Sequence, residues 1–94
     1  MTISVRHGRP ARKPEVWVRQ ASGENAVYAP GSSQVQLMNE TALAIWQLCD
    51  GVTSLREMVD AICEISNMHP DVVQEDVTRI LADFDRAGLI EWKS

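Results

Sequence analysis

The chain has 94 residues, enough for one domain and too few for two, and 45% of them are apolar, so a packed core is possible. The net charge of −4 is unevenly distributed. Residues 1–33 hold five Lys/Arg and two Asp/Glu, whereas residues 34–94 hold four Lys/Arg and eleven Asp/Glu. No apolar run approaches the roughly 18–20 residues that a membrane span needs, and the N-terminus lacks the hydrophobic core of a signal peptide. We therefore expect a cytoplasmic protein with a basic arm and an acidic body.

The cysteines and histidines do not form the pattern of a metal site. Cys49 and Cys63 fall in apolar helical patterns, where a free thiol behaves as a small hydrophobe. A reducing compartment disfavours a disulfide between them, so we expect buried thiols. With His7 and His69 they make two Cys and two His, but no pair is two to four residues apart, as zinc modules require. The sequence therefore predicts no metal site.

The first half of the chain reads as an arm followed by short strands. Residues 1–14 contain two prolines and little periodicity, which predicts a flexible basic arm and leaves residues 15–94 as a single domain. The composition predicts strands at 15–20, 26–29 and 34–38, which are separated by turn residues. Short turns between short strands favour an antiparallel meander.

The second half has helical periodicity. Asn39 is a good N-cap for a first helix, and Ser54 with Glu57 forms the pattern of a capping box for a second. Pro70 stands near the first turn of a third helix, in which apolar residues recur at helical spacing. The apolar tail Leu89–Trp92 is expected to pack back on the core.

These elements predict an α+β fold that is winged-helix-like, with an N-terminal three-stranded antiparallel sheet followed by three helices. A sheet of three strands has two edges. At least one edge of so short a sheet stays open unless another segment covers it.

Catalytic patterns are absent from the sequence. No nucleophile elbow, phosphate loop or dinucleotide fingerprint is present. Cys63 has no cationic neighbour in sequence that would activate its thiol as a nucleophile. The carboxylates of residues 71–87 read as a solvated helix face. We therefore expect no enzyme activity and no cofactor.

Nucleic-acid binding is disfavoured by charge. In a helix-turn-helix arrangement residues 71–87 would be the reading helix. They contain five carboxylates and two arginines, a net charge of −3. DNA carries about one negative charge per 1.7 Å of its axis and would repel this helix.

Five stretches follow one another at defined spacing: Leu37-Met-Asn-Glu-Thr-Ala42, Ile45-Trp-Gln-Leu-Cys-Asp-Gly51, Thr53-Ser-Leu-Arg-Glu-Met58, Glu75-Asp-Val-Thr-Arg-Ile-Leu81 and Ala87-Gly-Leu-Ile90. In this order and spacing they resemble the PqqD family, and the resemblance covers roughly residues 15–92. Met38 stands where the family usually has Leu, and the basic arm is not a family signature.

The resemblance implies a non-catalytic peptide chaperone, also called a RiPP recognition element. Such domains bind the leader of a ribosomally made precursor peptide and deliver it to a modifying enzyme, often a radical S-adenosylmethionine enzyme. The product is a modified peptide or a cofactor such as pyrroloquinoline quinone. An open strand edge suits this role, because an extended peptide can add to it as another strand.

By analogy with the family, the peptide would lie between the third strand and the third helix. The candidate peptide-binding residues are Gln34, Val35, Gln36, Leu37, Met38, Asp76, Arg79, Ile80 and Asp83. The alternative for Val35, Leu37 and Ile80 is that they are simply core. Strict alternation turns Val35 and Leu37 inward, whereas the family match turns Met38 inward, and a bulge near Met38 would reconcile the two.

Other readings of the sequence remain open. The main alternative function is a winged-helix transcription-related protein or a general protein–protein adaptor. The oligomeric state is also open, because an open edge beside a mobile arm allows either a monomer or a strand-exchanged dimer.

Overall fold

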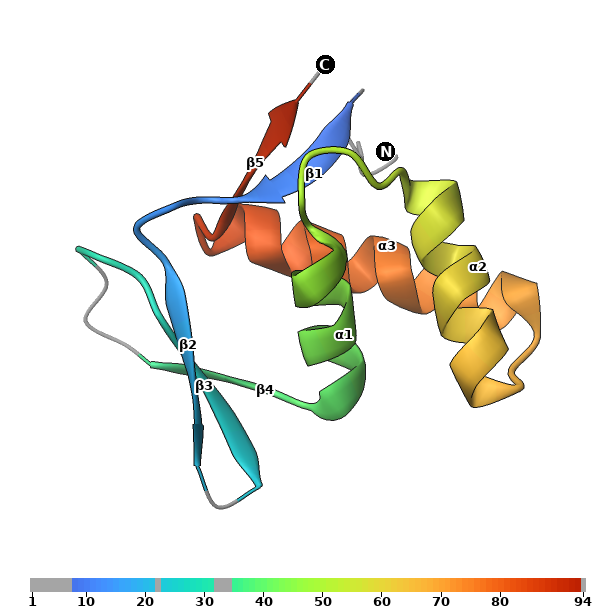
Figure 1. Ribbon diagram of the computed structural model, residues 1–94, viewed down its shortest axis with the longest axis horizontal. Coiled ribbons are helices and arrows are strands. Elements are labelled where there is room, and N and C mark those ends of the chain that lie inside the picture. Colours follow the sequence, from blue (N-terminus) through green and yellow to red (C-terminus); the bar gives the residue numbers. More distant parts are fainter. Residues whose placement is uncertain (1–7, 22, 32–34, 94) are drawn as a thin grey trace.

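The structure is a computed structural model that describes residues 8–21, 23–31 and 35–93. Figure 1 shows the β2–β3–β4 sheet at one end of the molecule and α2 at the other, with α1 between them and α3 behind. The elements in chain order are β1 Arg9–Arg12, β2 Trp17–Ala21, β3 Glu24–Tyr28, β4 Gln36–Met38, α1 Glu40–Leu48, α2 Leu55–Ser66, α3 Pro70–Arg86 and β5 Ile90–Lys93. The predicted α+β class, with a three-stranded antiparallel sheet before three helices, is confirmed.

The predicted meander is the sheet β2-β3-β4, in which both pairs of neighbours are antiparallel. Its strands differ from the predicted ones mainly at their ends. The first begins at Trp17, the second at Glu24, and the third covers only Gln36–Met38. Gln34 lies outside the described residues. Propensity locates the strands, but cross-strand hydrogen bonds set their ends.

The register of β4 corrects the prediction from alternation. Met38 is 7% exposed and turns inward, whereas Leu37 is 66% exposed and turns outward. The ladder runs without interruption from Asn25↔Met38 to Val27↔Gln36, so the proposed bulge is not present in these pairs. The buried Asn25 side chain also donates to the Met38 carbonyl at 3.2 Å. The inward position of Met38 therefore follows from its pairing with a buried residue of β3.

Part of the predicted flexible arm is a strand. Arg9–Arg12 form β1, which pairs antiparallel with β5 near the other end of the chain, and Figure 1 shows the two side by side. Ala11 is buried, and the Arg12 N–H donates to the Cys49 carbonyl at 2.9 Å. The prediction missed β1 because its partners are remote in sequence. The expected return of the apolar tail is confirmed, since Leu89 and Ile90 are buried and β5 follows.

The helix starts follow the sequence closely. The Asn39 side chain accepts from the Ala42 N–H at 2.8 Å. Ser54 and Glu57 form the predicted capping box at the start of α2. α3 begins at Pro70. Each cap satisfies N–H groups that have no partner within the helix.

The core lies between the sheet and the helices. Ile45, Met58 and Leu81, one from each helix, have no measurable exposure. Trp46 of α1 packs edge-on against Phe84 of α3, with ring centroids 5.7 Å apart and an interplanar angle of 86°. Such edge-to-face pairs add about 0.5–1.5 kcal/mol beyond area burial. This contact packs α3 against α1.

Candidate functional site

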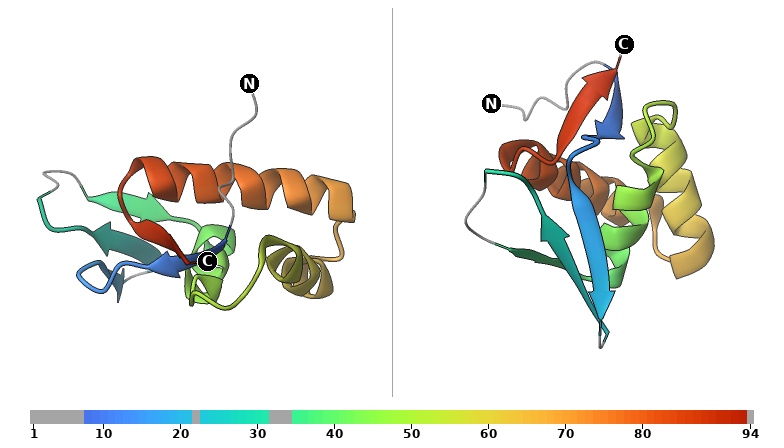
Figure 2. Two further views of the ribbon diagram at one scale, coloured as in Figure 1. Left: turned by 90° about the horizontal axis from the view of Figure 1, so that it is seen from above. Right: turned by 60° about the vertical axis from the view of Figure 1, so that its left-hand side comes forward.

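The candidate site begins with β4, which lies at one edge of the three-stranded sheet. Within the described residues β4 has one pairing partner, β3. Figure 2, left, shows β4 on the side of the sheet nearest α3. An edge strand presents unpaired N–H and C=O groups that another extended segment can use. As far as the described residues extend, one edge of β4 is thus available for pairing.

The side chains of β4 divide between the surface and the core. Leu37 is 66% exposed, Val35 just before the strand is 51% exposed, and Gln36 is also exposed. Met38 is buried and packs with the core. Apolar side chains of this size gain roughly 1.5–3 kcal/mol when they are buried fully. Leu37 and Val35 are therefore available to an incoming partner, whereas Met38 anchors the strand to the core.

The candidate residues of α3 also divide into two kinds. Ile80 is 7% exposed and belongs to the core cluster, which agrees with the alternative reading that it packs inside. Asp76 is half-buried, and Arg79 and Asp83 are exposed. Asp76, Arg79 and Asp83, and not Ile80, are therefore the candidate residues of this helix that a peptide could contact.

The charges on α3 are paired along the helix. The Arg79 guanidinium lies 3.5 Å from a carboxylate oxygen of Asp76, and Arg86 pairs with Asp83. Exposed pairs at this spacing contribute only about 0.2–0.5 kcal/mol. They can exchange partners at little cost, so a charged peptide could replace either partner.

A shallow hollow of about 530 Å³ runs along α3. Of the candidate residues, Arg79 lines it. Gln74, Thr78 and Ala82 line it as well, and the sequence prediction omitted them. These three lie four residues apart, which places them on one helix face. That spacing was the signal in the sequence that could have identified them.

The cysteines differ in exposure. Both are free; Cys49 is buried and Cys63 is half-buried, so the expectation of buried thiols holds fully for Cys49 alone. Burial raises the pKa of Cys49 to about 12, which the nearby Arg12 only partly offsets. The thiol donates to the Ile45 carbonyl at 3.3 Å. Since the thiolate is the nucleophile, Cys49 is unsuited to covalent chemistry at neutral pH.

Within residues 8–21, 23–31 and 35–93, no group of three or more His, Cys, Asp or Glu side chains is arranged to hold a metal ion. His7 lies outside that range. His69 is the N-cap of α3, and its Nδ1 accepts from the Asp71 N–H at 3.1 Å. No helix in the same ranges has the length and apolar character that crossing a membrane requires.

Solved structures share this fold. A structure of TbiB1 in complex with the TbiA(beta) leader peptide matches with a TM-score of 0.76 at 19% identity, over 89% of this chain and 98% of that chain. The solution NMR structure of the PqqD truncation of Methylobacterium extorquens PqqCD matches with a TM-score of 0.73 at 18% identity, over 87% of both chains. The second is described as a functional and stand-alone recognition element for ribosomally synthesized and post-translationally modified peptides (RiPPs).

Sequence comparison shows the family. Curated proteins give no significant match to the chain. The family profile of coenzyme PQQ synthesis protein D (PqqD) matches residues 24–90, which include all three helices and the strands β3 and β4. The resemblance found in the sequence is thereby confirmed, and the chain belongs to the PqqD family.

Proposed function

We propose that this chain is a non-catalytic recognition module that binds the leader of a ribosomally made precursor peptide and presents it to a modifying enzyme, a radical S-adenosylmethionine enzyme or one of similar role. The observation that carries the proposal is β4, an edge strand with one described partner and with Leu37 two-thirds exposed. Membership of the PqqD family and the fold shared with TbiB1, whose structure contains a leader peptide, support it. Precursor peptides are made on ribosomes, so the proposal places the module in the cytoplasm.

The proposed binding mode is strand addition. The leader pairs through its main chain with β4, and its alternate side chains contact Leu37 and Val35 on one wall. The other wall is the polar face of α3, where Arg79 and Asp83 exchange their present partners for charges on the leader. Main-chain pairing supplies affinity, and the side-chain contacts supply selectivity. The net charge of −3 on α3 disfavours DNA as an alternative ligand.

The test is a titration of isotope-labelled protein with a synthetic leader from a candidate precursor peptide that is encoded near this chain's gene. Backbone amide shifts are expected at 35–38 and along the exposed face of α3. Leu37→Asp should weaken binding about tenfold, because it places a charge at an apolar contact. Ile65→Asp is the matched control, since Ile65 is 75% exposed on α2, and it should leave affinity unchanged. Shifts that bypass both 35–38 and α3 would refute the proposed site.

A further inference from the structure

The sheet has a second edge, formed by β2 on the side opposite β4. A hollow of about 580 Å³ lies between β2 and α1, and a second of about 450 Å³ adjoins it where the β2–β3 turn faces α1. Gln20, Leu43 and Gln47 line both, and residues 23–25 line the second. They therefore form one continuous groove between β2 and α1, called here the β2–α1 groove. Its β2 side is Trp17–Gln20. Since an edge strand forms one wall and a helix forms the other, the groove has the geometry that accepts an extended peptide segment.

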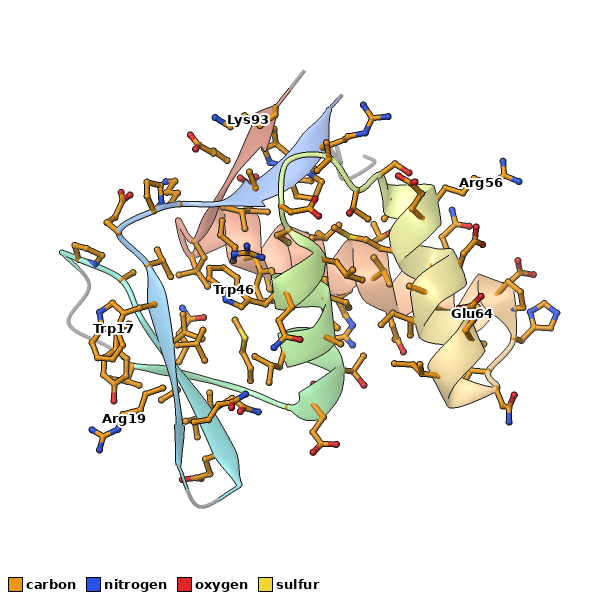
Figure 3. All side chains as sticks on the ribbon, in the orientation of Figure 1. Trp17, Arg19, Trp46, Arg56, Glu64 and Lys93 are labelled. Atoms are coloured by element: carbon orange, nitrogen blue, oxygen red, sulfur yellow. The ribbon has the colours of Figure 1, made fainter. Side chains whose placement is uncertain are left out.

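The β2–α1 groove has an apolar floor and a polar rim. Val18 and Leu43 are half-buried and line the floor with the largely buried Trp46. Figure 3 shows Trp46 projecting from α1 toward β2. Gln20 and Gln47 are exposed, and their amides can donate to and accept from a peptide main chain.

An aromatic pair marks one end of the groove. Trp17 is 55% exposed and stacks on Tyr28, with ring centroids 4.2 Å apart and an interplanar angle of 14°. Figure 3 shows Trp17 and Arg19 projecting from β2 on the side away from α1. Both also line the larger hollow. A tryptophan held in place by stacking is a typical anchor for a protein partner, because little side-chain freedom is lost on contact.

The two ends of the groove carry opposite charges. Arg19 lines the half beside Trp17, and Glu24 and Glu40 line the other half. A strand that adds antiparallel to β2 would start near the two glutamates and end near Arg19. Its complementary sequence has a basic residue at its N-terminal end and an acidic residue at its C-terminal end. This charge order selects both the occupant and its direction.

We propose that the β2–α1 groove binds an extended segment of the modifying enzyme with this basic-to-acidic order. The inference rests on the proposed function, since presentation requires the module to hold leader and enzyme together. β2 and β4 are the two opposite edges of one sheet, so an enzyme strand at β2 leaves β4 open to the leader. The module then joins the two partners through a single continuous sheet.

The test uses the full chain, the synthetic leader and the purified enzyme that modifies the corresponding precursor. Arg19→Glu reverses the charge at one end of the groove, and Gln47→Trp fills its middle from an exposed position. Arg56→Glu is the matched control, because Arg56 is exposed on α2 and lies away from the groove in Figure 3. Amide spectra of all variants verify the fold, and Arg19→Glu carries the test if Gln47→Trp does not fold.

The expected result separates the two partners. Enzyme affinity falls about tenfold for Arg19→Glu and Gln47→Trp, while leader affinity stays within about twofold for every variant. Enzyme affinity that is unchanged in both groove variants would overturn the inference and leave the proposed function standing. The enzyme titration is repeated without leader. Enzyme-induced shifts at Trp17–Gln20 alongside a leader that never binds would support the groove and reject the leader site.

Discussion

At the residue scale, single polar side chains form hydrogen bonds with the backbone at the ends of helices. Asp50 is an example. It follows α1, and its Oδ1 accepts from the N–H groups of Val52 at 2.9 Å and Thr53 at 2.8 Å, while the Thr53 hydroxyl donates to Oδ2 at 3.0 Å. These bonds to the charged form, the Val52 N–H first, lower the pKa of Asp50. The turn between α1 and α2 is therefore stabilised by an ionised carboxylate.

This arrangement makes stability depend on pH in a defined direction. A carboxylate with a lowered pKa contributes its full stabilisation above its unfolded pKa of about 3.9, and this is lost as the pH falls through the folded value. We expect the urea midpoint to fall below about pH 4, and to fall less in Asp50→Asn. Thr53→Val should keep most of the dependence, because it leaves both backbone bonds intact. Equal acid dependence in the unaltered chain and Asp50→Asn would contradict this account.

At the element scale, β4 and α3 each serve the core and the surface at once. Met38 and Ile80 are 7% exposed, whereas Leu37, the neighbour of Met38, is 66% exposed. The alternation along a strand and the 3.6-residue period of a helix produce this division. Binding and stability therefore depend on different side chains of the same two elements, and substitution can separate them.

Two alanine substitutions test that separation. Ile80→Ala should cost about 2–4 kcal/mol of unfolding free energy, because it leaves a cavity in the core. Leu37→Ala should change stability by less than about 0.5 kcal/mol, since the side chain is mostly in water, yet should weaken leader binding. Chemical denaturation and leader titration on both variants provide the measurements. A large stability loss in Leu37→Ala would show that β4 contributes to the core in another way.

At the scale of the whole molecule, Arg12 links distant parts of the chain. Its Nη1 donates to the carbonyls of Trp46 at 3.1 Å and Gln47 at 2.8 Å, near the C-terminal end of α1. α1 has no basic residue of its own in its last turn. A cation there donates to carbonyls at the end of the helix and interacts favourably with the helix dipole. The β1–β5 sheet is thereby tied to α1.

Loss of the hydrogen bonds from Arg12 to α1 should destabilise the paired strands β1 and β5. Arg12→Ala should cost about 1–2 kcal/mol, and amide exchange at Ile90–Lys93 should quicken. Arg12→Lys should recover only part of the stability, because an ammonium group lacks the planar fork of donors. Arg9→Ala is the matched control at an exposed position of β1. Equal losses in Arg9→Ala and Arg12→Ala would indicate that charge alone, and not the bonds to α1, matters.

Much of the fold could be predicted because its signals are local. Asn39, and Ser54 with Glu57, act on N–H groups within three residues of themselves, so the helix starts were predictable. The meander was predictable in outline, since turn-forming residues separate its strands in the sequence. For the candidate site, the sequence predicted two regions, the third strand and the third helix, but not which of their side chains face outward. Which side chains face outward depends on register, and Asn25 of β3 pairs with Met38 across the sheet.

The sequence by itself determined the helices, the three strands of the meander, the family and the absence of recognisable catalytic patterns. Only the tertiary structure decided that Arg9–Arg12 pair with β5, that Met38 and not Leu37 turns inward, and that β2 and α1 enclose a groove. The physical reason is the distance along the sequence between the residues that interact. Caps, turns and periodicity act within a few residues, whereas strand pairing and grooves require segments that meet only after the chain has folded.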